Sequence, residues 1–369
     1  MQRRSFHALD GLRFVAAVVV VTRHLPDPTL RHWLPGSYLA VDLFFCMSGF
    51  VLAHAYQARL MSSAMSFGDF MRVRVVRLWP LYLLGTAIGA LLSAFLIYRA
   101  GSGAALWQAW AWSLLFSVLM LPTPGWAALG IWCFNFCWPA WSLYWEMLVG
   151  SIYALIAPRL SMVGLSIILA VGAGLLALTG FMCGSLDSGA ALERFAAGGM
   201  RVLWSFFAGV AVYRIWQKGW VPGWRCPFWI SAFILIAILA VDPASGRWPF
   251  DVVAAILFFP ALVLASLGDV PRAFETPLAQ LGGVSYALYI LHAPLIKWSD
   301  NLSTLAGHPM SAAGVWPSLA ILCAAIVIAA VVHATFDKAA RTWLGAAFAS
   351  RRFEQPRRLR ARLSRHLGA

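Results

Sequence analysis

The sequence predicts an all-α polytopic membrane protein with about ten transmembrane helices (10–12) and with both termini in the cytoplasm. The chain has 369 residues, of which 61% are hydrophobic and only 11% are charged. A soluble globular protein carries about 25% charged residues, so too little polar surface remains here to cover such an apolar core. Eleven apolar stretches of about 20 residues each account for most of the chain and leave no room for a separate soluble domain.

The apolar stretches follow one another along the chain and are separated by short polar loops. They cover residues 9–27, 38–57, 75–98, 104–121, 140–157, 162–182, 200–216, 227–241, 251–267, 279–298 and 312–335. Many of the 19 tryptophans lie near the ends of these stretches, where the membrane–water interface accommodates an indole ring. The pattern predicts a helical bundle in the membrane.

Lys and Arg in short loops predict which loops are cytoplasmic. They occur at the N-terminus, after the second stretch, in later loops around Arg159 and Arg214, and throughout the C-terminal tail. All of these regions should share one side, so the number of crossings must be even. We predict ten crossings, with 104–139 as a re-entrant or interfacial segment that lines a cavity, because Pro122 and Pro124 interrupt it. A short additional crossing at 122–139 is the alternative.

The sequence divides into a transmembrane domain, 1–336, and a basic cytoplasmic tail, 337–369. We expect the tail to contact anionic lipid head groups rather than nucleic acid. We also expect no bound metal or cofactor. The six cysteines are scattered, and no His or carboxylate beside Cys133 and Cys137 completes a metal site.

Ionisable side chains inside the apolar stretches indicate function, because each costs about 2.5–3.5 kcal/mol at the bilayer centre. Arg13 and His24 are separated by eleven residues, so they share one helix face about 16 Å apart along the axis. Two anchors that extend to opposite interfaces are the alternative. In the second stretch, Asp42 requires a partner, whereas Gly49 beside Ser48 permits close helix packing.

Three later stretches add further polar groups. Arg74 and Arg77 lie one turn apart at the start of the third stretch, where they either bind an anion or flank a cytoplasmic loop. Ser142 and Glu146 share a helix face at a spacing of four residues. An intramembrane Glu indicates function, and a buried pair with an Arg is the alternative. A stripe in 279–298 consists of Ser285, Tyr289 and His292.

The predicted topology sorts these residues by depth. The outer half contains His24, Asp42, Ser142 and Glu146, with His292 nearer the middle, and the inner half contains Arg13, Arg74 and Arg77. We therefore predict a chamber with an anion-binding inner end and an acid–base outer end.

These motifs resemble the acyltransferase 3 family of membrane acyltransferases, which modify sugars on bacterial surface polymers and related acceptors. The matching features are LDGLR with an Arg-x10-His pattern that ends at His24, DLFFCMSGF at 42–50, RVVR at 74–77, WSLYWE at 141–146 and SYALYILH at 285–292. The family's late helix often ends in an aromatic-Glu-x-Pro signature, whereas here Phe336 is followed by Asp337.

The resemblance implies a protein of the bacterial cytoplasmic (inner) membrane that uses acyl-coenzyme A, with acetyl-coenzyme A as the expected donor. The acceptor would be a hydroxyl of a carbohydrate or glycolipid, such as an exopolysaccharide, an O-antigen or a lipid-linked sugar. A polysaccharide-assembly complex is a further expected type of partner. Some relatives carry an extracytoplasmic hydrolase-like domain, and we expect this chain to act without one or with a separate protein.

The chemistry of the residues suggests a role for each. Arg13, Arg74 and Arg77 would hold the donor phosphates, and His24 would accept the proton of the attacking hydroxyl. Asp42 or Glu146 would orient the His24 ring. The remaining candidates, for the oxyanion or the substrate, are Ser48, Ser142, Ser285, Tyr289 and His292. A covalent acyl-His24 intermediate is a less favoured variant.

Two other classes of protein remain as alternatives. A transporter or flippase also uses intramembrane Arg, His and Glu residues, but the two halves of this chain show no matching broken helices. A second group of membrane-bound acyltransferases uses a His in an apolar span, and the ordered motifs fit it poorly.

Overall fold

The structure is a computed structural model that describes residues 4–220, 226–244, 246–310 and 314–348. Helices dominate these residues, and the only β pairing among them is an isolated bridge between Trp132 and Ala191. Seven of the described helices are long and apolar enough to cross a membrane. The predicted class, an all-α membrane protein, is therefore confirmed.

Each predicted apolar stretch coincides with a helix or a run of helices. The main ones are α1 (His7–His24), α3 (Ala40–Met61), α4 (Phe67–Arg99), α5 (Ala104–Val118), α6 (Ala140–Ile156), α7 (Met162–Cys183), α8 (Phe195–Gln217), α9 (Phe228–Ala240), α10 (Arg247–Val253), α11 (Phe259–Ala265), α12 (Arg272–Leu305) and α13 (Val315–Val332). A π-helix (Ala254–Phe258) joins α10 to α11, and a second one (His333–Asp337) follows α13. Short helices include α2 (Thr29–Trp33) and η1 (Ser37–Leu39).

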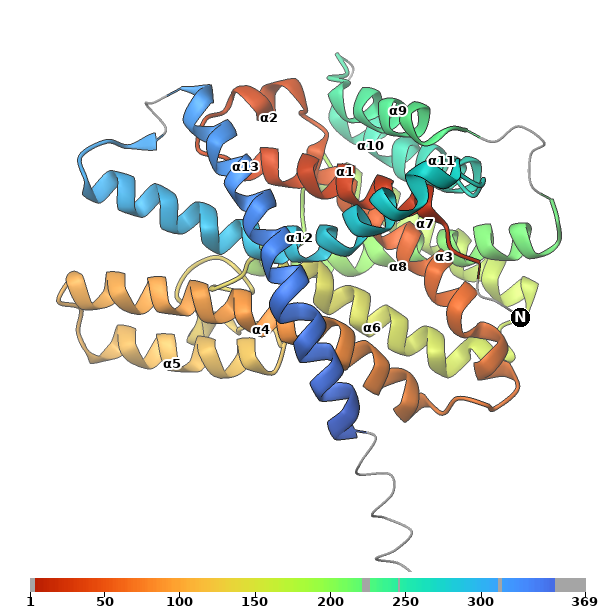
Figure 1. Cartoon of the computed structure of the whole chain (residues 1–369), viewed down its shortest axis with the longest axis horizontal. Helices are drawn as coiled ribbons and strands as arrows, with labels where there is room; N and C mark the ends of the chain where they lie inside the picture. Colours follow the sequence, from red (N-terminus) through yellow and green to blue (C-terminus); the bar gives the residue numbers. More distant parts are fainter. Residues whose placement is uncertain (1–3, 221–225, 245, 311–313, 349–369) are drawn as a thin grey trace, which may run out of the picture.

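The bundle is organised around two helix pairs. α1 packs mainly against α12, and α3 packs mainly against α8. In Figure 1 the hairpin of α4 and α5 lies on one side of these pairs, and α9, α10 and α11 lie on the other. Peripheral helices expose large apolar side chains, such as Val163 and Met182 of α7. Such surfaces suit a lipid environment, where only the backbone polar groups require internal partners.

Glycines bring α3 and α8 into close contact. A Cβ atom added at Gly49 of α3 would overlap the carbonyl oxygen of Phe206, and one added at Gly209 of α8 would overlap that of Cys46. The two helix backbones therefore touch at reciprocal positions. This contact confirms that Gly49 serves close helix packing.

The segment between α5 and α6 does not form a further crossing. Its only described helical turn is η2 (Gly125–Ala127), so the alternative of an additional span at 122–139 is wrong. The backbone instead folds back into the protein, because the Thr123 amide donates to the Cys133 carbonyl at 2.8 Å. Phe134 and Phe136 in this loop are buried.

The chain remains helical beyond residue 336, where the sequence predicts the start of the tail. The helix continues through the π-helix as far as Phe348. Residues 349–369, which carry most of the positive charge of the predicted tail, lie outside the described residues.

We expect Gly49→Ala to destabilise the bundle, because the added methyl group would push α3 away from α8. Overpacking of this kind costs about 1–3 kcal/mol. The matched control is Gly174→Ala in α7, where nothing lies within 4 Å of an added Cβ atom. Thermal unfolding in detergent should show a lower midpoint for Gly49→Ala and an unchanged or higher one for Gly174→Ala; equal midpoints would contradict the close contact.

Candidate active site

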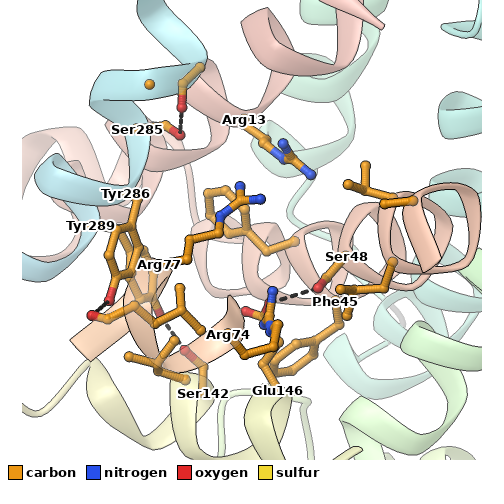
Figure 2. Close-up of a pocket in the computed structure, with 18 of the residues that line it drawn as sticks. Arg13, Phe45, Ser48, Arg74, Arg77, Ser142, Glu146, Ser285, Tyr286 and Tyr289 are labelled. Carbon is orange, nitrogen blue, oxygen red and sulfur yellow. Dashed lines mark hydrogen bonds and ion pairs between the residues drawn. The ribbon is translucent and has the colours of Figure 1, made fainter. Parts of the chain in front are cut away.

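A cavity of about 160 Å³ collects the three predicted arginines from two helices. Arg13 comes from α1, and Arg74 and Arg77 come from the first turns of α4 (Figure 2). The structure therefore brings together the three cations that the sequence assigns to an anion. We call this space the arginine cavity.

One carboxylate neutralises part of this charge. Arg74 Nη2 lies 2.6 Å from Glu146 Oε1, and the Ser48 hydroxyl donates to the same oxygen at 2.7 Å. Arg13 lies 3.5 Å from Asp10. Arg77 is exposed to the cavity and has no ion pair or hydrogen bond with any residue that the structure describes. Arg77 is therefore the guanidinium group most available to a ligand.

This geometry corrects the predicted role of Glu146. The sequence assigns Glu146 to the outer half as one possible partner of His24, whereas the structure pairs it with Arg74, as in the alternative of a buried pair with an Arg. One helical turn separates the two polar residues of α6, so Ser142 reaches Tyr289 while Glu146 reaches α4. Ser48 is bonded to Glu146 and forms part of the same cluster.

A fourth arginine, Arg341, also lines the arginine cavity and was not among the predicted site residues. Its guanidinium group forms two contacts of 2.7 Å with Asp337, which is fully buried and lies 2.9 Å from His333 Nδ1. His333, Asp337 and Arg341 are spaced by four residues, which is the signal that could have revealed them. The π-helix His333–Asp337 ends at this carboxylate, and such insertions are frequent at functional sites.

A second cavity, of about 630 Å³, contains His24. Trp132, Trp138 and Pro139 line it, which confirms that the segment 104–139 borders a cavity. We call this space the histidine cavity. Val41 and Tyr289 line both cavities, so these two side chains form the wall between them.

His24 and His292 form a pair at the junction of α1 and α12. His24 Nδ1 lies 2.8 Å from the Val20 carbonyl oxygen and 3.3 Å from His292 Nε2. His292 Nδ1 lies 3.2 Å from the Leu288 carbonyl oxygen. Since a carbonyl oxygen can only accept, each Nδ1 carries the hydrogen in neutral rings. His24 Nδ1 therefore donates toward both Val20 and His292, and His24 Nε2 keeps a lone pair.

The stripe on α12 is divided between the two ends of the site. The hydroxyl oxygens of Tyr289 and Ser142 lie 2.6 Å apart. The Ser285 hydroxyl donates to the Gly282 carbonyl oxygen at 2.7 Å and faces the arginine cavity (Figure 2). The structure therefore places Ser285 with the arginines, Tyr289 at the wall and His292 beside His24.

Asp42 pairs with an arginine and does not contact His24. The prediction that Asp42 orients the His24 ring is therefore wrong. The Asp42 carboxylate is fully buried and lies 2.6 Å from Nη2 of Arg201, a residue of α8 that is only 1% exposed. The close packing of α3 on α8 brings this pair together. Arg201 was not among the predicted site residues. Its position inside the apolar stretch 200–216 could have indicated that it pairs with a buried carboxylate such as Asp42.

The fold and the site define a multi-pass membrane protein with an arginine-lined cavity on one side of a shared wall and a histidine pair on the other. The chain belongs to the acyltransferase 3 family, whose model, described as an acyltransferase domain, matches residues 6–335. It is therefore a membrane acyltransferase, and this membership favours an enzyme over the transporter or flippase alternative.

Two curated relatives support the assignment. "Protein 2 in picA locus" of Rhizobium radiobacter is 38% identical over 183 residues, which cover 46% of this chain and 91% of that protein. Acyltransferase MdmB of Streptomyces mycarofaciens is 25% identical over 375 residues, which cover 92% of each chain. No solved structure matches the chain.

We expect Asp42→Asn to destabilise the protein, because it leaves the Arg201 charge buried and unpaired. Breaking a buried ion pair in this way costs about 3–5 kcal/mol. The double variant Asp42→Leu with Arg201→Met removes both charges and should recover most of this loss. Unfolding midpoints in detergent would check both outcomes, and an Asp42→Asn protein as stable as its parent would refute a structural role for the pair.

Proposed function

We propose that the chain transfers an acyl group, with acetyl the expected one, from cytoplasmic acyl-coenzyme A to a hydroxyl of a carbohydrate acceptor. Exopolysaccharides, O-antigens and lipid-linked sugars are acceptors of this class. The observation that carries the proposal is the arrangement of four arginines and a histidine pair on opposite sides of one wall, Val41 and Tyr289. The name of the relative MdmB, an acyltransferase, supports the reaction type.

The proposed topology has ten crossings of a bacterial inner membrane, with both termini cytoplasmic. Arg13 lies in the first half of α1, Arg77 lies near the start of α4, and Arg341 lies near the end of the last membrane-length helix, Val315–Phe348. Each is close to one of the basic regions that should remain in the cytoplasm. This topology opens the arginine cavity toward the cytoplasmic donor and the histidine cavity toward the other side.

The donor phosphates bind to the arginine cavity in this proposal. Guanidinium groups remain charged at all physiological pH values and bind phosphate oxygens through pairs of N–H donors. Arg77 has no protein partner among the described residues, and Arg13 has only the 3.5 Å contact with Asp10. Asp337 and Glu146 hold Arg341 and Arg74 in fixed positions. The pantetheine arm then extends past Tyr289 toward His24.

The proposed transfer step takes place at the histidine pair. The acceptor hydroxyl gives its proton to His24 Nε2, and its oxygen forms a bond to the thioester carbonyl carbon. The carbon–sulfur bond then breaks, and the proton on His24 passes to the departing thiolate, which leaves as coenzyme A. His292 accepts from His24 Nδ1 and stabilises the imidazolium, which is the task that the sequence assigns to Asp42 or Glu146. In this proposal the Tyr289 hydroxyl turns from the Pro139 carbonyl oxygen to donate to the oxyanion.

Two variants separate the two ends of this site. We expect His24→Gln to lower kcat by about 10²–10⁴-fold, because it removes the general base, with little change in the KM for the donor. Arg77→Gln should raise that KM by about tenfold or more, because one charge-assisted bond to phosphate is lost. Release of coenzyme A by membranes that contain the chain and its natural acceptor would measure both.

The matched control is Arg99→Gln, which removes an exposed cation at the end of α4 that lines neither cavity. It should leave both parameters unchanged. A fully active His24→Gln protein, inserted at normal levels, would reject the proposed base.

A further inference from the structure

The histidine cavity carries more positive charge than its carboxylates balance. Five cationic side chains line it: Arg23, Arg31, Arg194, Arg201 and Lys297. Two of them are neutralised, because Arg23 pairs with Asp187 and Arg201 pairs with Asp42.

The other three cations, Arg31, Arg194 and Lys297, are exposed and have no ion pair with any described residue. Among the lining residues only Glu193 remains to oppose them, since Asp187 is already paired. A cavity with an uncompensated positive charge attracts negative ligands and raises their local concentration.

The side of the membrane on which these cations lie is unusual for Lys and Arg. In the proposed topology, Arg31 and Arg194 lie in the connections on the side away from the cytoplasm, and Lys297 lies in the half of α12 nearest to that side. Short loops on that side are normally poor in Lys and Arg. Membrane insertion therefore does not account for cations that gather around one cavity there, whereas an anionic ligand does.

The cavity wall also provides flat aromatic surfaces beside the reactive histidine. Lys297 Nζ lies 5.3 Å from the centroid of the Trp138 ring, and the His24 ring centroid lies 5.8 Å from the same indole. Trp132 and Trp141 add two more indoles to the lining. Aromatic surface with a few charged groups suits a sugar ring that carries an acidic substituent.

We propose that the acceptor is an anionic carbohydrate, with a carboxylate or a phosphate group, and that Arg31, Arg194 and Lys297 bind this group beside His24. The inference rests on the proposed function, which places the acceptor hydroxyl at His24. It narrows the substrate class from carbohydrates in general to acidic ones.

The experiment compares glycans and glycolipids from bacteria that have the chain with those from bacteria that lack it. Anion exchange at pH 7 separates acidic from neutral material, and mass spectrometry detects acyl increments in each fraction. We expect the chain-dependent increment in the retained, acidic fraction, where composition analysis would distinguish a uronate carboxylate from a phosphate.

A chain-dependent acyl increment found only in neutral material would overturn the inference. The three cations would then be interpreted as contacts for lipid head groups. No chain-dependent acyl increment in either fraction would instead reject the proposed function.

Variants in the same cells test the three cations directly. Lys297→Gln combined with Arg31→Gln should lower the acylated fraction of the acidic glycan at least about tenfold, while Lys297→Arg should retain most of it. Arg99→Gln, on the same side of the membrane but outside the cavity, should have no effect, and immunoblots would verify equal insertion. Parental acylation in the double variant would refute recognition by these side chains.

Discussion

The desolvation of arginine side chains is the constraint on which the site depends. Four guanidinium groups, those of Arg13, Arg74, Arg77 and Arg341, converge inside an apolar bundle. A charge removed from water is strongly unfavourable unless it is paired, so each group must find a carboxylate or remain in contact with the cavity. Glu146 and Asp337 serve two of them, and the rest of the charge faces the cavity. This arrangement supports the proposal that the cavity binds a donor with several negative charges.

The same constraint explains why carboxylates that could have served catalysis do not. Asp42 is fully committed to Arg201, and its other oxygen receives the Arg201 Nε–H at 3.3 Å. Without these charged partners, His24 relies on a backbone carbonyl and on a second neutral imidazole. In the proposed mechanism, these two acceptors rather than a carboxylate therefore stabilise the imidazolium that forms on His24.

Sequence patterns were sufficient for much of the fold, because a helix in lipid must satisfy its own backbone and show a long apolar run. Each predicted stretch coincides with helical structure, and Arg13, Arg74 and Arg77 converge on one cavity, as their placement on one predicted side of the membrane implies. The sequence pattern does not show which arginine pairs with which buried carboxylate. Asp42 and Glu146 are both carboxylates within apolar spans, and only the packing of α3 on α8 and of α6 beside α4 decides which arginine each meets.

Two further features of the site result from helix packing and cannot be predicted from local sequence patterns: the pairing of His24 with His292 and the position of Arg341. His292 meets His24 because α12 lies along α1, over more than 260 residues of sequence separation. Arg341 lies beyond the apolar run, where charge density suggests a solvated tail, yet the helix continues and returns the side chain to the cavity. A stripe of ionisable residues with helical spacing, such as the one from His333 to Arg341, is therefore informative even outside an apolar stretch.

In the proposed mechanism, one ligand spans the wall between the arginine cavity and the histidine cavity. An experimental structure of the chain with bound coenzyme A would test this arrangement. We expect density for the phosphates among Arg13, Arg74, Arg77 and Arg341, with the thiol beyond Tyr289 and next to His24. Density for the phosphates in the histidine cavity, or for a thiol that points away from Tyr289, would contradict it.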